Sequence, residues 1–336
     1  MLRILVTILF FSISGWLYSQ QQSVDQLRAT ALSFQRNQDF SNAIMVLDRA
    51  LQMEPGNLQL QKDVAYAYYL SGDLENAAIR ARPLVDREDA DEQAYQIAAH
   101  IFRTKGQARI SEKILKSGLK KFEGSGPLCS EMGELYWEKE NPSQAIKFWE
   151  TGVVSDPSYS GNYYHAAKFY YAAGDKARSI IYGEIFLNLE SYSPRSNEIK
   201  ILLLESYKRA YMPADQKQYY IKPTTEFERD ILSVLQRQSA LVVRGIDTET
   251  LYILRSRFIL DWFNSFGGKY KFQLFDHMRY MMRVGIFEAY NQWIFGTASD
   301  PNAFVIWANT NSDAYQAFLR MQQNQLFTMP SGQHYF

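Results

Sequence analysis

The sequence is poor in two features that would each point to a class of protein. It contains a single cysteine, Cys129, among 336 residues, so no disulfide can form within the chain. Lysine plus arginine number 36, as do aspartate plus glutamate, so the formal net charge is zero. Proteins that bind nucleic acid usually carry a basic excess, which is absent here. We therefore expect a fold stabilised by packing and no nucleic-acid partner.

Catalytic and metal-binding motifs are missing as well. The four histidines (His100, His165, His277 and His334) form no His-Glu-x-x-His pair and have no cysteine partners, which excludes the common zinc motifs. Asp276 precedes His277, but neighbouring residues on a helix point about 100° apart, so we interpret this histidine as structural. The sequence predicts no catalytic residue, no metal, no cofactor and no enzyme.

An apolar run from Ile4 to Leu17 follows a single cation, Arg3. It is shorter than the roughly 20 residues that span a membrane and fits the apolar region of a secretory signal peptide. We expect residues 1–19 to be a signal peptide that is cleaved after Ser19. The mature chain would then have no transmembrane span and would be periplasmic or associated with the outer membrane. An uncleaved membrane anchor is the alternative.

Small residues recur every 34 positions between residues 31 and 179. Two columns, 12 positions apart, contain only Ala, Ser or Gly, and an aromatic residue follows each member of the first column by three positions. The first column is Ala31, Ala65, Ala99, Gly133 and Ala167; the second is Ala43, Ala77, Ser111, Ala145 and Ser179; the aromatics are Phe34, Tyr68, Phe102, Tyr136 and Tyr170. Antiparallel helices approach closely where side chains are small, so this spacing predicts repeated helix–turn–helix units.

The 34-residue period and its small and aromatic positions resemble the tetratricopeptide repeat. The resemblance implies an all-α fold, a superhelical solenoid of five repeats over residues 24–193. The repeats would start near Val24, Leu58, Glu92, Gly126 and Ser160. Cys129 falls at a packing position of its repeat, so we expect a buried thiol. With the signal and the segment FEAYNQWIFG, the repeats also resemble exported tetratricopeptide proteins of Bacteroidota.

The period fails after Pro194, and the remaining chain predicts helices that do not repeat. Residues 194–212 predict a helix that caps the solenoid, and a linker follows. Residues 224–336 predict a helical C-terminal domain.

Within this domain, Thr225 and Glu228 have the spacing of a capping box. Asp247 is predicted to cap the next helix, and residues 272–296 predict one long helix. Further helices are predicted to start at Asp300-Pro301 and at Ser312.

In the tetratricopeptide family, side chains of each repeat's first helix line a concave groove that holds peptides or helices. The resemblance places a set of cations and aromatics at those positions. They are Arg28, Arg36, Lys62, Tyr66, Tyr69, His100, Arg103, Glu134, Trp137, Tyr164, Lys168 and Tyr171. Aromatic residues and arginine are the commonest binding hot spots, so the set predicts a basic and aromatic trough. We expect two or three of its five aromatics to be exposed and the others to pack against neighbouring helices.

These features together predict an exported scaffold or adaptor in a bacterial envelope assembly, serving secretion or outer-membrane biogenesis. Its partners would be envelope or secreted proteins that present a peptide or a helix. One alternative is a glycan- or lipid-binding module, because exposed Trp and Tyr also suit sugar stacking. The other is an enzyme whose site lies in the C-terminal helical domain.

Overall fold

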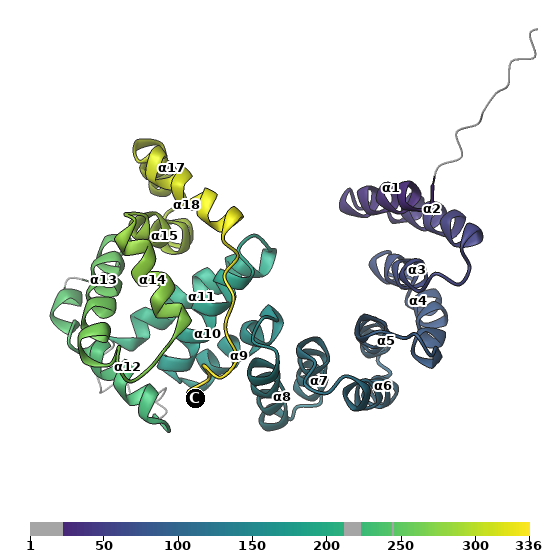
Figure 1. Cartoon of the computed structure of the whole chain (residues 1–336), viewed down its shortest axis with the longest axis horizontal. Helices are drawn as coiled ribbons and strands as arrows, with labels where there is room; N and C mark the ends of the chain where they lie inside the picture. The colour runs from purple at the N-terminus through teal and green to yellow at the C-terminus, as the bar shows by residue number, and fades with distance from the viewer. Residues whose placement is uncertain (1–22, 212–222, 244) are drawn as a thin grey trace, which may run out of the picture. The chain divides into compact units, whose positions relative to one another are not determined.

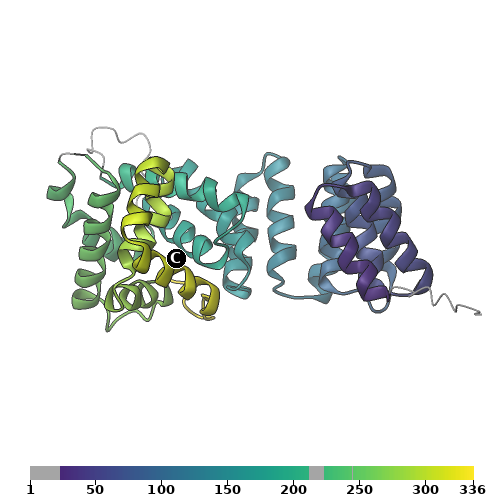
Figure 2. The ribbon, with the colours of Figure 1, turned by 90° about the horizontal axis from the view of Figure 1, so that it is seen from above.

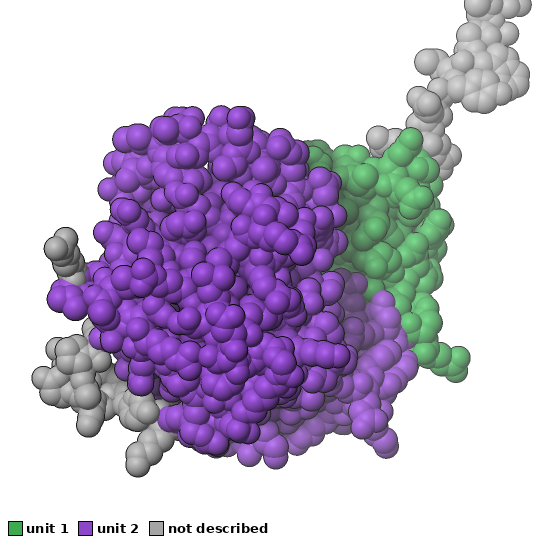
Figure 3. Space-filling view, turned by 60° about the vertical axis from the view of Figure 1, so that its left-hand side comes forward, with its two compact units in different colours: residues 1–89 green, residues 90–336 purple. Residues whose placement is uncertain are grey.

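The computed structural model describes residues 23–211, 223–243 and 245–336, and within those ranges the chain forms helices and no strand. The predicted signal peptide, residues 1–19, and most of the predicted linker lie outside the described residues. The chain divides into two compact units, Met1–Asp89 and Ala90–Phe336, which are described separately (Figure 3). Figures 1 and 2 show the helices of each unit.

Five pairs of helices follow the 34-residue period. The first helices are α1 (Val24–Arg36), α3 (Leu58–Leu70), α5 (Glu92–Thr104), α7 (Gly126–Glu138) and α9 (Ser160–Ala173). The second helices are α2 (Phe40–Met53), α4 (Leu74–Ala81), α6 (Ala108–Lys121), α8 (Pro142–Ser155) and α10 (Lys176–Leu189). The first helices begin at the five predicted starts, so the all-α repeat fold is confirmed.

The two columns of small residues lie where the paired helices cross, and all ten residues are buried. Gly133 shows why the position must be small. A Cβ atom added there would lie 2.1 Å from the indole nitrogen of Trp149. The prediction that these residues permit close packing is therefore confirmed.

The turn inside each helix pair also repeats every 34 residues. One residue per turn has a positive φ: Gln38, Gly72, Gly106, Glu140 and Gly174. Glycine adopts this left-handed conformation without a steric penalty, whereas Gln and Glu pay about 1 kcal/mol. An Asp or Asn side chain then caps the following helix in four of the five pairs: Asp39, Asp73, Asn141 and Asp175.

The second helix of the second pair is shorter than the others. α4 ends at Ala81 after 8 residues, whereas α2 has 14, and a 3₁₀ turn follows over Arg82–Asp86. Pro83 cannot donate a backbone hydrogen bond, so the α-helix cannot continue through it. The boundary between the two compact units, after Asp89, follows this turn.

The second unit continues from α5–α10 into helices that do not repeat. They are α11 (Pro194–Ala210), α12 (Glu226–Gln236), α13 (Thr248–Ser265), α14 (Gln273–Arg283), α15 (Phe287–Asn291), α16 (Thr297–Ser299), α17 (Pro301–Thr310) and α18 (Ser312–Asn324). The predicted capping box at Thr225 and Glu228 is present, as are the caps at Asp247 and Asp300. The predicted helix start at Ser312 is also confirmed.

The single long helix predicted over residues 272–296 is wrong. α14 ends at Arg283 because Gly285 adopts a positive φ of 78°. The amides of Gly285 and Ile286 donate to the carbonyls of Met282 and Met281, which closes the helix C-terminus in a Schellman motif. α15 then starts afresh, and a π-helical turn covers Gln292–Gly296.

One hydrophobic core joins the last repeats to the C-terminal helices. It extends from Ala145 on α8 to Met329 beyond α18 and includes most of the large aromatic residues between them. α11 packs against α10 and also contacts α16. The domain boundaries predicted from the sequence stay a prediction. The first unit has a smaller core of its own, built around Leu27, Leu47 and Leu60.

Candidate protein-interaction site

The predicted groove residues of the first unit lie on α1 and α3. Arg28 pairs with Asp63, with 2.5 Å between its Nε and the carboxylate, and Lys62 is buried. Tyr66 is 40% exposed and its ring stacks on that of Tyr69, with 5.6 Å between centroids. Arg36 is exposed at the end of α1. In this unit the structure therefore presents Tyr66, beside its stacked neighbour, as the exposed aromatic.

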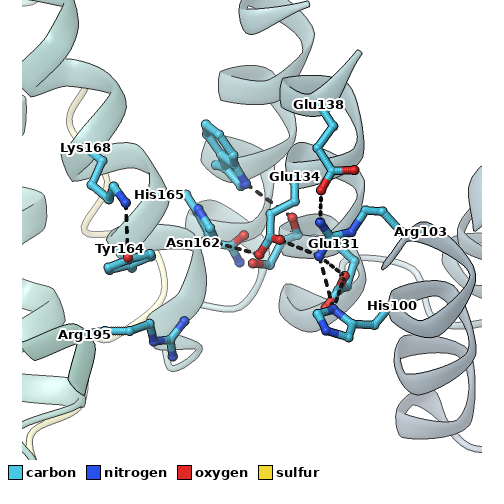
Figure 4. A network of polar contacts seen from close by, with 12 residues as sticks. His100, Arg103, Glu131, Glu134, Glu138, Asn162, Tyr164, His165, Lys168 and Arg195 are labelled. Atoms are coloured by element: carbon cyan, nitrogen blue, oxygen red, sulfur yellow. Dashed lines mark hydrogen bonds and ion pairs between the residues drawn. The ribbon is translucent and has the colours of Figure 1, made fainter. Parts of the chain in front are cut away.

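The predicted groove residues of the second unit lie on α5, α7 and α9. Figure 4 shows that several of them converge on one network of polar contacts. His100, Arg103 and Glu134 are members of the predicted set, and the structure adds Glu131, Glu138 and His165. These three residues lie on the same helices as predicted members, but the family positions do not include them.

Arg103 is the centre of this network. Its side chain is 7% exposed and contacts three carboxylates of α7. Nη2 lies 2.5 Å from Glu134 and 3.2 Å from Glu131, and Nη1 pairs with Glu138. Because a buried guanidinium paired in this way has little freedom to turn toward a partner, we interpret Arg103 as a residue that fixes α5 against α7.

Two histidines complete the network from either side. His165 of α9 lies 2.8 Å from Glu134, and His100 of α5 lies 3.2 Å from Glu131. Burial alone would raise the pKa of Glu134, but the hydrogen bond from His165 and the nearby positive charges lower it to about 2. Burial would likewise lower the pKa of His100, yet the contact with Glu131 raises it. The network therefore links three consecutive first helices, α5, α7 and α9.

Trp137 is the exposed member of this face. Its side chain is 50% exposed although it stands beside two other aromatic rings. The ring centroids of Trp149 and Phe169 lie 6.1 Å and 6.4 Å away. Trp149 in turn stacks on His165 at 5.0 Å. The indole of Trp137 thus packs on two rings, one of which also contacts the charged network, while half of its surface faces solvent.

Tyr164 and Lys168, one turn apart on α9, form a second group of polar contacts. Lys168 lies 2.7 Å from Glu198 of α11 and 3.1 Å from the phenol of Tyr164, which itself donates to Glu198. The guanidinium of Arg195 lies over the Tyr164 ring at 5.0 Å. Tyr164 is only 8% exposed, so it supports neighbouring residues and offers little surface.

Tyr171 is half-buried, and the guanidinium of Arg209 lies 3.7 Å from the centre of its ring. Of the five aromatics predicted for the groove, Tyr66 and Trp137 are exposed, which confirms the expected number.

The trough is less basic than predicted. Arg28, Arg103 and Lys168 each pair with a carboxylate of a neighbouring helix. The sequence could not show this, because the partners lie 28 to 35 residues away along the chain. They meet because one repeat step brings equivalent faces of adjacent first helices together.

Other residues singled out in the sequence have structural surroundings. Cys129 is buried, and burial raises the pKa of its thiol to about 11, which confirms the predicted core position. Burial lowers the pKa of His277 to about 4, and its ring packs on Phe327. Asp276 pairs instead with Arg279. No group of His, Cys, Asp or Glu in the described ranges could hold a metal ion. Likewise, among the helices described, none is long and apolar enough to cross a membrane.

Comparisons with known proteins find solved structures, among them two tetratricopeptide repeat proteins. TTC0263, a thermophilic protein of this kind from Thermus thermophilus, matches with 14% identity and a TM-score of 0.46, over 55% of this chain and 98% of its own. A tetratricopeptide repeat protein from Parabacteroides merdae matches with 14% identity and a TM-score of 0.40, over 90% of this chain and 100% of its own. The human IFIT1 dimer with PPP-AAAA matches with 18% identity and a TM-score of 0.42, over 71% of this chain and 60% of the IFIT1 chain.

No protein-family model and no curated protein matches the sequence. Because the TM-scores are low, the fold assignment rests on the helix positions described above. TTC0263 and the Parabacteroides merdae protein are described as proteins of the repeat that the sequence resembles.

Proposed function

We propose that the chain is a protein-interaction scaffold and that the face of α5, α7 and α9 around Trp137 binds a peptide or a helix from a partner protein. The observation that carries the proposal is the half-exposed indole of Trp137, backed by Trp149 and Phe169. A rigid aromatic side chain loses little conformational entropy on binding, and tryptophan is the residue type most enriched at hot spots.

The network of ion pairs around Arg103 supports the same proposal. Arg103 and His165 tie the three first helices together, so the face around Trp137 is organised before a partner arrives. Pre-organisation lowers the cost of binding, because fewer side chains must be ordered in the complex. The proposal assigns no catalytic step to the chain.

We further propose that the scaffold works outside the cytoplasm, in an envelope assembly of a bacterium. The apolar run from Ile4 to Leu17 supports this part. Cell fractionation and N-terminal sequencing test it: the mature chain is expected in the periplasmic or outer-membrane fraction and to begin at Gln20. A cytoplasmic chain that retains Met1 would contradict export and leave the proposed binding face unaffected.

Crosslinking in the native envelope tests the binding face. The wild-type chain is compared with Trp137→Ala and with Leu260→Ala, a control whose side chain is 56% exposed on α13. We expect the wild type and the control to crosslink to the same defined proteins and Trp137→Ala to lose them. If Trp137→Ala keeps the full set, the face around Trp137 is not the site. If the wild type captures no protein, the glycan and lipid alternatives take precedence.

A further inference from the structure

The last residues of the chain cover a second surface on the repeat helices of the second unit, and Trp137 is not among the residues that line it. After α18 ends at Asn324, the last residues form no helix and run back along the repeats (Figure 1). We call residues 326–336 the tail. At the start of the tail, exposed and buried side chains alternate: Leu326 is 85% exposed, whereas Phe327 and Met329 are buried. This is how an extended peptide lies in a groove.

The groove is built by the repeat helices α8, α9 and α10. It is lined by Val153 and Pro157 at the end of α8, Tyr163 of α9, and Tyr182 and Ile185 of α10. The rings of Tyr182 and Tyr163 lie 5.8 Å apart, so Tyr182 also has a packing partner within the repeats. Between these residues and the tail remains a cavity of about 20 Å³, which holds about one water molecule. The tail therefore fits the groove closely.

The final four residues of the tail each make a specific contact. The side-chain oxygen of Gln333 accepts a 2.6 Å hydrogen bond from the backbone amide of Gln273, the first residue of α14. That helix has no side-chain cap of its own, so the tail supplies one. His334 shares a 3.0 Å hydrogen bond with the hydroxyl of Tyr182.

Tyr335 and Phe336 fill an aromatic site beside these polar contacts. The ring of Tyr335 lies 5.0 Å from that of Phe227, and its hydroxyl donates to the carbonyl of Lys271 at 2.9 Å. The ring of Phe336 lies 5.3 Å from Phe227, and the guanidinium of Arg178 lies over it at 5.6 Å. The surrounding helices therefore contact four consecutive side chains of the tail: two that form hydrogen bonds and then two aromatic rings.

We propose that this groove is a peptide-binding site and that the tail is its ligand within the same chain. The ligand that replaces the tail is an extended partner segment of the same chemistry, with two consecutive aromatic residues after a pair of hydrogen-bonding side chains. A segment tethered to its own site has an effective concentration of about a millimolar. A free partner therefore binds only when the tail is released, and the tail controls access to the site.

Peptide binding to a shortened chain tests the proposal. The chain is ended after Met329, which keeps the buried Phe327 and Met329, and the probe is a fluorescent peptide of residues 330–336. We expect saturable binding to the shortened chain and binding at least about tenfold weaker to the full chain, because the tethered tail competes. A probe that carries Tyr335→Ser and Phe336→Ser is expected not to bind. Circular dichroism checks that the shortened chain is folded.

Two results would overturn the proposal. One is a folded, shortened chain that does not bind the probe. The other is equal binding to the shortened and full chains, which would place the peptide elsewhere. If the shortened chain does not fold, hydrogen exchange of the Gln273 backbone amide in the full chain decides, because this amide donates to Gln333 of the tail. Exchange of this amide faster than that of the α10 amides is expected for a tail that is released while the helices stay folded, whereas exchange as slow as that of α10 would make the tail a permanent part of the core. None of these results depends on Trp137.

Discussion

Replacing Arg255 by methionine is expected to destabilise the second unit strongly, because this arginine forms a buried ion pair between a repeat and the C-terminal helices. Arg255 of α13 is 2% exposed, and Glu184 of α10 is completely buried. The guanidinium contacts both carboxylate oxygens, at 2.7 and 2.8 Å, and also donates to Asn291 at 2.5 Å. The hydroxyls of Tyr207 and Tyr290 donate to the same carboxylate.

The magnitude follows from the charge that the substitution leaves behind. Removing one partner of a buried, hydrogen-bonded ion pair costs about 3–5 kcal/mol, because the other charge remains buried without compensation. Removing both charges lowers the free energy of unfolding by less than the sum of the two single losses. The loss of unfolding free energy in the double variant Glu184→Leu with Arg255→Met is expected to be smaller than the summed losses of the two single variants by more than about 1 kcal/mol. Arg257→Met, at an exposed position of the same helix, is expected to change stability by no more than about 0.5 kcal/mol.

Urea unfolding followed by tryptophan fluorescence measures this effect. Every tryptophan in the described ranges lies in the second unit, so the signal reports on that unit. A free-energy loss of less than about 1 kcal/mol for Arg255→Met would refute the reasoning. So would a double variant whose effect equals the sum of the single effects, because the two charges would then be independent.

Two further predictions concern packing and pH. Gly133→Ala places a Cβ atom 2.1 Å from the indole nitrogen of Trp149 and is expected to cost about 1–3 kcal/mol in urea unfolding; a neutral result would contradict the close helix crossing. His334 faces Tyr182 and Arg178 of α10 and Glu150 of α8, and its burial lowers its pKa. The docked tail thus favours the neutral ring of His334, so the affinity of the shortened chain for the peptide of residues 330–336 is expected to be constant above about pH 6.5 and to fall as the pH drops below that value. His334→Gln is expected to remove this pH dependence, and an unchanged profile would exclude the histidine as its cause.

The sequence predicted the repeats well because their signal is local and recurs. Each helix pair needs a small residue at its crossing and a turn residue between its helices, so Ala145 or Gly174 is informative at its own position in the chain. The caps at Thr225, Asp247 and Asp300 were predictable for the same reason, since a cap bonds to amides two or three residues away.

Features that depend on distant residues could not be predicted in this way. Glu184 and Arg255 are 71 residues apart, and His334 lies 152 residues from Tyr182. The helix break at Gly285 was missed because an apolar pattern continues through it. In the candidate site, the family positions indicated Trp137 but gave no sign that neighbouring carboxylates would neutralise Arg103.

The contribution of Trp137 to partner binding tests the central claim most directly. The measurement is the dissociation constant of a captured partner segment for the wild-type chain, for Trp137→Ala and for the exposed control Leu260→Ala. A hot-spot tryptophan contributes at least about 2 kcal/mol, so Trp137→Ala is expected to weaken binding about 30-fold or more while the control binds like the wild type. A dissociation constant that Trp137→Ala leaves unchanged would contradict the account.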